Sequence, residues 1–203
     1  TPIRIQGRPT TRKLRYVEMG YLHKLFEVYT MDDTPLDETT RKEIDRVTAE
    51  RVRGADVVIV TDFGHGMIAS STIGALIANS KFLAVNAQSN SGNHGYNLIT
   101  KYPRADYVCI DAPEARLAAT DKFSDIASVI ENRLHGKIDC DNMIITHGSF
   151  GCYPFSSKTG VARVPAFTKT VVDTVGAGDA FLTITAPLVA AGGNIEDVAF
   201  IGN

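Results

Sequence analysis

Four short apolar runs constrain the fold of this chain more strongly than any other feature of its sequence. Runs of this length with few polar residues are typical of β-strands buried on both faces, as strands are in parallel sheets. Helix-like segments alternate with them, and a parallel pair of strands needs such a crossover connection. The pattern therefore predicts an α/β protein, a three-layer α/β/α sandwich with a mainly parallel sheet. The four runs are Ala55–Thr61, Phe82–Val85, Asp106–Ile110 and Asn142–Thr146.

The segments around these runs complete the expected architecture. Lys13–Tyr21 and Leu25–Thr30, with Leu22–Lys24 as the turn, carry many polar residues and predict a solvent-facing hairpin. Leu36–Arg53 is helical in period and heavily charged, which predicts a surface helix. We find no internal repeat or linker, so residues 1–203 are expected to form a single domain. The other expected elements are helices at 70–80, from 113, at 180–191 and at 195–202, and a meander of strands at 152–155 and 161–164.

Composition narrows the classes of partner. The chain has 203 residues with 21 Lys and Arg, 23 Asp and Glu and a net charge of −2, and its basic residues are scattered. This argues against a nucleic acid or a membrane surface as partner. No apolar run reaches the roughly 18 residues of a membrane span, and no signal-peptide pattern opens the chain. The three cysteines form no C-x-x-C pair, which favours buried free thiols in a reducing compartment, the cytoplasm, over a disulfide or a metal site.

The segment 173–179 reads D-T-V-G-A-G-D and lies between the strand-like Lys169–Val172 and a helix-like run. At such a junction the first N–H groups of the helix have no partner within it, and the helix dipole adds partial positive charge. Phosphate groups bind at such sites. A carboxylate beside them, Asp179, suits a base that takes a proton from a hydroxyl as the hydroxyl attacks phosphorus. The alternatives are a glycine turn without a ligand, and Asp179 as a helix cap.

This segment resembles the second signature of the ribokinase-like (PfkB) carbohydrate kinases. The resemblance implies an ATP-dependent phosphotransferase that phosphorylates a hydroxyl of a sugar or sugar phosphate. It implies that Asp179 is the base, and that the N–H groups of Gly176, Ala177 and Gly178 hold the charge that develops on the transferred group. It further implies that Asp173 coordinates a monovalent cation such as K⁺, as its counterpart does in some relatives.

A second motif follows the third apolar run, where Asp111-Ala112-Pro113-Glu114 resembles the N-x-x-E motif of the family. The family motif positions hydrated Mg²⁺, so the resemblance implies that Glu114 and Asp111, together with Asn86, organise Mg²⁺. Asp111 departs from the family's Asn and adds negative charge. The residues themselves allow a local alternative, in which Asp111 caps the next helix and Glu114 is an acidic first-turn residue.

The fourth apolar run ends in Thr146-His147-Gly148-Ser149-Phe150-Gly151, which is similar to the family's T-x-G-x-x-G loop. In the family this loop touches the phosphates and the ribose edge of the nucleotide. Asn203 matches a family Asn that lies near the adenine. The resemblance therefore implies a nucleotide-binding set of Asn86, Thr146, Gly148, Gly151, Thr174 and Asn203.

Amide side chains gather after the second apolar run, at Asn86–Asn90 and again at Asn93 and Asn97. They offer hydrogen-bond donors and acceptors without charge, as contacts to polyhydroxyl or phosphate groups need. Asn and Ser also favour turns, so a plain turn-forming loop is the alternative.

The stretch Thr61–Gly66 reads T-D-F-G-H-G and resembles the S-D-Y-G-K-G turn of the heptose-7-phosphate kinases, a branch of the same family. His65 stands where the branch has a lysine. Asp62 either faces the acceptor substrate or caps the turn. The letters D-F-G also spell the magnesium motif of protein kinases, but no H-R-D loop or V-A-I-K strand accompanies them, which argues against that interpretation.

By resemblance, the chain begins and ends inside a longer family member, without the family's first strands. Residues 13–30 then form part of a β lid, and such lids often pair into homodimers. One further hypothesis is a degenerate kinase fold that binds sugar or nucleotide without turnover, motivated by His65 and Asp111. Another is a nucleotidyltransferase, whose H-x-G-H motif is absent here. The identity of the sugar does not follow from the sequence.

Overall fold

A six-stranded sheet organises the molecule. The computed structural model describes residues 3–20, 23–168 and 175–203. The strands lie in the order β3-β4-β5-β6-β7-β8; β3 to β6 run parallel, and β7 and β8 are antiparallel. The mainly parallel sheet predicted from the apolar runs is therefore confirmed. The strands are β3 (Val58–Asp62), β4 (Leu83–Ala87), β5 (Tyr107–Asp111), β6 (Asn142–Thr146), β7 (Cys152–Ser156) and β8 (Gly160–Val161).

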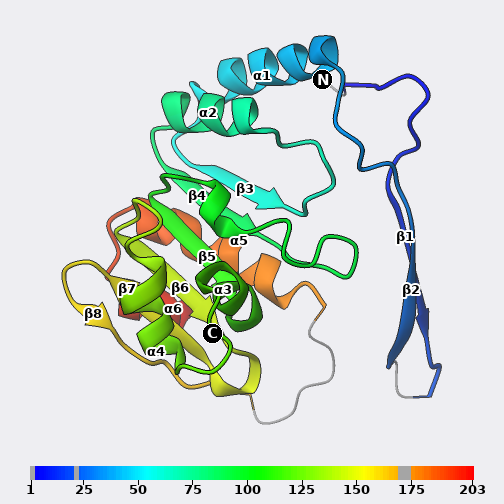
Figure 1. The fold of residues 1–203 in the computed structure, drawn as a ribbon. Helices are drawn as coiled ribbons and strands as arrows, with labels where there is room; N and C mark the ends of the chain where they lie inside the picture. Colours follow the sequence, from blue (N-terminus) through cyan, green and yellow to red (C-terminus); the bar gives the residue numbers. More distant parts are fainter. Residues whose placement is uncertain (1–2, 21–22, 169–174) are drawn as a thin grey trace.

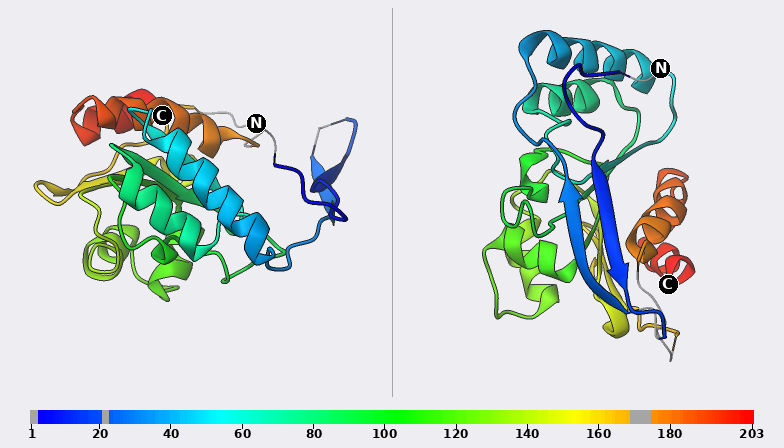
Figure 2. Two further views of the ribbon diagram at one scale, coloured as in Figure 1. Left: turned by 90° about the horizontal axis from the view of Figure 1, so that it is seen from above. Right: turned by 90° about the vertical axis from the view of Figure 1, so that its right-hand side faces the viewer.

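Helices cover both faces of this sheet and complete the predicted three layers (Figure 1; Figure 2). Because side chains alternate along a strand, each central strand feeds two cores. In β4, Leu83 and Val85 join the core under α2, α3 and α4, whereas Ala84 joins the core under α5 and α6. The helices are α1 (Glu38–Val52), which packs on α2, then α2 (Ser70–Asn79), α3 (Ala112–Ala119), α4 (Ile126–Val129), α5 (Ala177–Ala190) and α6 (Ile195–Gly202).

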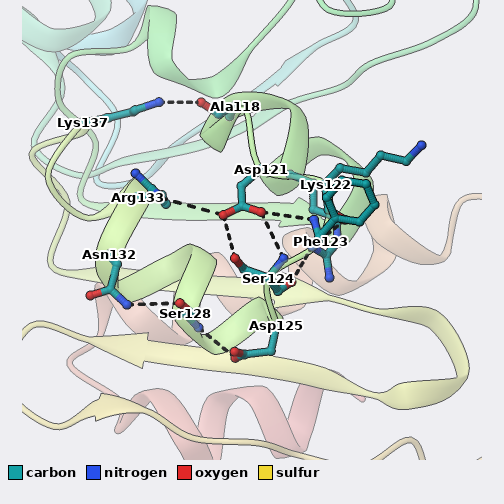
Figure 3. Close-up of polar contacts among 11 residues, drawn as sticks. Ala118, Asp121, Lys122, Phe123, Ser124, Asp125, Ser128, Asn132, Arg133 and Lys137 are labelled. Carbon is teal, nitrogen blue, oxygen red and sulfur yellow. Dashed lines mark hydrogen bonds and ion pairs between the residues drawn. The ribbon is translucent and has the colours of Figure 1, made fainter.

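Two helical segments, rather than the one that the sequence predicted, connect β5 to β6. α3 stops at Thr120, whose φ of 57° is left-handed. Asp121 then turns the chain, because its carboxylate accepts hydrogen bonds from the N–H groups of Phe123 (3.1 Å) and Ser124 (3.0 Å) (Figure 3). Asp125 caps α4, which continues into a π-helical turn, η2 (Ile130–Leu134). The break is made by carboxylate-to-backbone bonds, with no Gly or Pro to mark it.

The N-terminal strands form a separate two-stranded sheet. β1 (Arg12–Val17) and β2 (Lys24–Thr30) pair antiparallel and project away from the main body (Figure 1). The predicted hairpin is confirmed, although Lys24 belongs to β2 instead of the turn. The strand predicted at Lys169–Val172 lies outside the described residues.

The three cysteines, Cys109, Cys140 and Cys152, are free and buried, as predicted. Burial raises the pKa of the Cys109 and Cys140 thiols to about 12 and the pKa of the Cys152 thiol to about 11. They are therefore protonated and weakly nucleophilic at neutral pH.

Candidate active site

A cleft of about 630 Å³ opens at the carboxyl ends of the parallel strands. Ligands of open α/β sheets bind at this edge, because the strand ends and helix N-termini converge there. The cleft collects residues from the ends of β4, β5 and β6, from the start of α5 and from the end of α6. Eleven of the residues singled out in the sequence line it: Asn86, Asp111, Glu114, Thr146, Gly148, Gly151, Gly176, Ala177, Gly178, Asp179 and Asn203.

The start of α5 forms one wall of the cleft. Gly176 is the N-cap residue and has φ 81°, a left-handed conformation that favours glycine. Its carbonyl accepts the first helical bond, from the N–H of Ala180 at 2.9 Å, so the N–H groups of the first turn have no partner within the helix. The φ angle of Gly178 lies outside the left-handed region, so its backbone conformation does not require glycine. A Cβ added there would meet no atom within 4 Å. The first turn therefore presents open donors to the cleft.

Asp179 lies in this first turn and is exposed. Within the part of the chain that the structure describes, its carboxylate has no hydrogen-bond or ion-pair partner. The N-cap residue of the helix is Gly176, three residues earlier, and it has no side chain to make a cap. The geometry thus leaves Asp179 available to a ligand in the cleft.

Two carboxylates stand at the start of α3 on another side of the cleft. They form a reciprocal capping box: Asp111 accepts from the N–H of Glu114 at 2.8 Å, and Glu114 accepts from the N–H of Asp111 at 3.0 Å. The other Glu114 oxygen accepts from the N–H of Ser89 at 2.9 Å. The capping alternative is correct as a structural fact, and it leaves both residues lining the cleft.

The charges of these two carboxylates are poorly compensated. Burial, and then the nearby charge of Asp111, raise the pKa of Glu114 to about 7. Loss of surrounding water also raises the pKa of Asp111. Across the described ranges no Lys or Arg pairs with either group, and no cluster of three or more His, Cys, Asp or Glu side chains is arranged as a metal site. The pair is a place where a cation would be stabilised, with few protein ligands to hold it directly.

The loop after β6 closes the cleft from the side of β7. It contains the short helix η3 (Gly148–Phe150), and the N–H of His147 donates to the carbonyl of Gly151 at 2.7 Å. Gly148 has φ 52° and open space around it. Gly151 has φ 91°, and a Cβ there would lie 2.0 Å from the carbonyl oxygen of Val164. Gly151 is thus required by the close approach of two chain segments, whatever the cleft binds.

Amide groups at both ends of the cleft are anchored to the backbone. Asn86 donates to the carbonyl of Cys109 at 2.8 Å, and Asn203 donates to the carbonyl of Pro165 at 2.5 Å. Gln88, from the amide-rich stretch Asn86–Asn90, also lines the cleft, because it lies two residues after Asn86 and strand side chains repeat every second residue. Lining residues to which the sequence assigned no role are Ser149, Ala166, Thr168 and Phe181.

Asp62 lies outside this cleft, beside a second hollow of about 280 Å³. It is 3% exposed and points to the face of the sheet that packs on α2 and α3. Its oxygens accept from the N–H of Gly64 at 3.0 Å and from the hydroxyl of Tyr102 at 2.7 Å, and it forms an ion pair with Lys101. This arrangement favours the turn-holding alternative for Asp62 over contact with an acceptor.

The amide-rich loop supports the same turn. The side-chain amide of Asn93 donates to the carbonyl of Phe63 at 2.8 Å, and that of Asn97 donates to the carbonyl of Asp62 at 2.8 Å. Both asparagines are buried. Their donors bind the protein backbone, as the turn-forming alternative predicts.

Comparison with known proteins identifies the family. The family model for pfkB family carbohydrate kinases matches residues 71–203. The chain belongs to the PfkB family. Among its curated relatives, it is 25% identical over 198 residues to the bifunctional protein HldE of Geobacter metallireducens, and 27% identical over 193 residues to HldE of Rhodopseudomonas palustris strain BisB5. These alignments cover 97% and 92% of the chain but only 39% and 38% of the relatives, so the chain spans about two fifths of their length.

Solved structures agree with the PfkB fold. Ribokinase from Thermotoga maritima superposes with a TM-score of 0.67 at 19% identity, covering 96% of this chain and 61% of the ribokinase. Arabidopsis thaliana ribokinase complexed with ribose and ATP superposes at 0.66 with 15% identity, covering 97% and 61%. A mutant form of phosphofructokinase-2 from Escherichia coli superposes at 0.68 with 13% identity, covering 87% and 58%. The predicted family and fold are confirmed.

Two of the predicted site residues are not among the residues that the structure describes. Asp173 and Thr174, expected to bind a monovalent cation and nucleotide, lie outside the described residues. In the described ranges, none of the helices combines the length and the apolar character needed to cross a membrane.

Proposed function

We propose that this PfkB-family protein transfers the terminal phosphoryl group of ATP to a hydroxyl of a sugar or sugar phosphate, and that it is nearest to the heptose-7-phosphate kinases. The observation that carries the proposal is the start of α5, where an open first turn faces one cleft together with the carboxylate of Asp179, which has no partner among the described residues. A phosphate-binding site and a base at the same helix end are what phosphoryl transfer to a hydroxyl requires.

In this proposal the nucleotide lies across the strand ends, with its terminal phosphate at the N–H groups of residues 176–178. Gly148 lets the loop after β6 approach it, because there is room for a ligand and no side chain at that position. Thr146, Asn86 and Thr174 border the phosphates, and Asn203 is at the adenine end. Gly151 keeps the loop against Val164 and lines the same cleft, so it shapes the nucleotide site and borders the nucleotide.

Asp179 takes the proton from the acceptor hydroxyl as its oxygen attacks the terminal phosphorus. The first-turn donors of α5 hold the negative charge that grows on the transferred group, and their positions are fixed before the reaction by the helix. The carboxylate needs no reorganisation because it has no competing partner in the described structure. Transfer of one phosphoryl group yields ADP and a phosphorylated sugar.

The residues present fit a hydrated Mg²⁺. The carboxylates of Asp111 and the buried Glu114 form no ion pair with a Lys or Arg in the described structure, and the nearby His147 offsets the burial of Asp111 only in part, so the pKa of Asp111 stays raised. The buried hydroxyl of Ser89 beside them has no hydrogen-bond partner among the described residues. Most of their oxygens already accept backbone N–H groups, which suits contact through water more than direct ligation. When bound, Mg²⁺ would neutralise charge on the phosphates. A K⁺ ion at Asp173 belongs to the same proposal.

The hairpin is proposed to serve as a lid and as the contact between two copies of the protein. Leu14, Tyr16, Phe26 and Val28 lie on one face of it and are 36–53% exposed, and the rings of Tyr16 and Phe26 stack at 4.4 Å. A second copy of this face would cover them, because the patch is self-complementary in character. Light scattering should show that the parent protein is a dimer and that Phe26→Ser is a monomer. Phe123→Ser, a change at another exposed Phe, is the control and should remain a dimer. A monomeric parent protein would refute the proposed dimer.

The test of the activity is nucleotide turnover with a panel of acceptors. The intact protein should release ADP from ATP in the presence of a sugar or sugar phosphate, heptose phosphates included, and only slowly without one. Isothermal titration with a non-hydrolysable ATP analogue runs in parallel. Analogue binding without acceptor-dependent ADP release would favour the degenerate, binding-only fold, and no nucleotide binding would refute the kinase proposal.

A further inference from the structure

Three basic side chains of the hairpin converge on one carboxylate. Nε of Arg15 lies 2.6 Å from Oε1 of Glu27, Nζ of Lys24 lies 3.4 Å from the same oxygen, and Nζ of Lys13 lies 3.5 Å from Oε2. The hydroxyl of Tyr29 donates to Oε2 at 2.9 Å. The Glu27 side chain is 11% exposed, whereas the three cations are 35–53% exposed. We call these four charged residues the lid cluster.

The lid cluster lies on the face of the hairpin that turns toward the body. Glu27 and Tyr29 are two residues apart and so share a face of β2. The ring of Tyr29 meets the ring of His65 edge-on at 6.3 Å, just beyond the end of β3. The apolar residues Leu14 and Val28 pair with each other on the opposite face. The charged face is thus the inner one, and the hairpin stands past the carboxyl ends of β3 and β4 (Figure 1).

The charges of the lid cluster do not balance. Three cations surround one carboxylate, an excess of two positive charges. Partial burial opposes ionisation of Glu27, but hydrogen bonds from Arg15 and Tyr29 and the charges of the two lysines outweigh it and lower the pKa of Glu27 to about 2. Glu27 is therefore a permanent anion at neutral pH. A phosphate monoester carries about −1.5 to −2 charges at pH 7 and several acceptor oxygens, which matches the excess.

A second group at the inner end of this face lacks a partner. Nε2 of His65 is buried and has no hydrogen-bond partner among the residues that the structure describes. An unsatisfied buried nitrogen is costly unless a ligand or water meets it. It adjoins Tyr29, so an anion held by the lid cluster would lie on the same inner face as this nitrogen.

We propose that Glu27 is a specificity-determining gate for the acceptor, an internal anion that occupies the lid cations until a dianionic group of the acceptor displaces it. The inference rests on the proposed kinase function for the identity of the acceptor. A neutral sugar cannot displace Glu27, because it offers the three cations no charge in return. A phosphorylated sugar can, because its dianion offers the three cations more negative charge than the single charge of Glu27. Glu27 thereby lowers the affinity for every anion and favours those of higher charge.

Inorganic phosphate is the probe, titrated calorimetrically at pH 7.5 and low salt into the intact protein without nucleotide. Glu27→Gln should bind phosphate more tightly, by about threefold to a hundredfold, because three exposed ion pairs no longer compete with it. Glu18→Gln is the matched control: it makes the same charge change on the same hairpin but outside the lid cluster, and it should bind as the parent does. Arg15→Gln should bind phosphate more weakly than the parent.

Two results would overturn the gate. One is phosphate binding in Glu27→Gln that is no tighter than in the parent. The other is an equal gain in Glu18→Gln, which would mean a general charge effect. If thermal melts show that Glu27→Gln is destabilised, Glu27→Asp is used in its place. The shorter Asp side chain reaches the three cations less well, so this variant should also bind phosphate more tightly than the parent. Phosphate binding needs neither ATP nor turnover, so a failed kinase assay and a failed gate remain distinguishable.

Discussion

Replacing Gly178 by alanine separates the stability of α5 from its proposed role in binding. Gly178 is in the first turn of the helix, its φ lies outside the left-handed region, and a Cβ added there meets nothing within 4 Å. Neither backbone strain nor packing therefore requires a glycine. The remaining reason is a ligand that approaches the backbone closely. The same substitution at Gly74, an exposed position within α2 that also has no atom within 4 Å of an added Cβ, is the matched control.

The two substitutions should have the same effect on stability and different effects on binding. Glycine in a helix is about 0.5–1 kcal/mol less favourable than alanine. Each variant should thus gain up to that amount, which raises Tm by about 1–4 °C in a domain of this size. At Gly178 the new methyl group would push a phosphate away from the N–H donors. Losing one charge-assisted hydrogen bond costs about 1.5–3 kcal/mol, or about tenfold to 150-fold in nucleotide affinity.

The assay is a thermal melt of each variant together with calorimetric titration of a non-hydrolysable ATP analogue and Mg²⁺. We expect both variants to melt slightly higher and only Gly178→Ala to lose affinity. The reasoning is refuted if Gly178→Ala binds the analogue as Gly74→Ala does, because the first turn would then merely start a helix. A lower Tm for Gly178→Ala would show that the open space at this position is filled in solution.

Three other predictions, which use four substitutions, test the site. Asp179→Asn should lower kcat by about a hundred- to ten-thousand-fold with Tm and ATP affinity nearly unchanged; a lower Tm with normal kcat in the same preparation would make Asp179 a helix cap. Without divalent cations, stability should fall as pH rises from about 4.5 to about 7, because the folded state keeps a proton on Glu114 that the unfolded chain has released. Urea titrations of Glu114→Gln should give a flatter pH profile, and an unchanged slope would contradict this origin. In urea melts, Gly151→Ala should lower the free energy of unfolding by at least about 2 kcal/mol, because the new Cβ clashes with the Val164 carbonyl. Gly148→Ala should lower it by about 1 kcal/mol, because only its left-handed φ opposes alanine. Equal losses in the two variants would show that the protein relieves the clash at Gly151.

Much of the fold could be predicted because it depends on local patterns. β6 has the bounds of its apolar run, and α6 those of its predicted helix. α5 begins at Ala177, three residues before the predicted start, because a helix can start directly after a left-handed Gly176. The break at Asp121 was missed, since it depends on which backbone N–H groups a carboxylate can reach and leaves no Gly or Pro in the sequence.

The candidate site divides in the same way. That Asp111, Thr146 and Asp179 meet at one edge follows from the sequence, because parallel strands end on the same side and each motif comes directly after a strand or opens a helix. Residue spacing could not decide whether Glu114 caps a helix or faces a ligand. In the structure Glu114 is part of the helix cap and also lines the cleft.

By itself the sequence determined the parallel sheet, the family and the position of the turn proposed to bind phosphate, because these depend on hydrophobic period and on residue types at fixed spacing. Only the tertiary structure decided which face a side chain takes. Asp62 follows Val60 onto the α2 side of the sheet and meets Tyr102, 40 residues away, while Thr61 pairs with Asn86 at the edge of the cleft. Likewise the pairing of β1 with β2 gathers three cations around Glu27. Such contacts depend on strand register and on segments distant in the chain, and no local pattern encodes either.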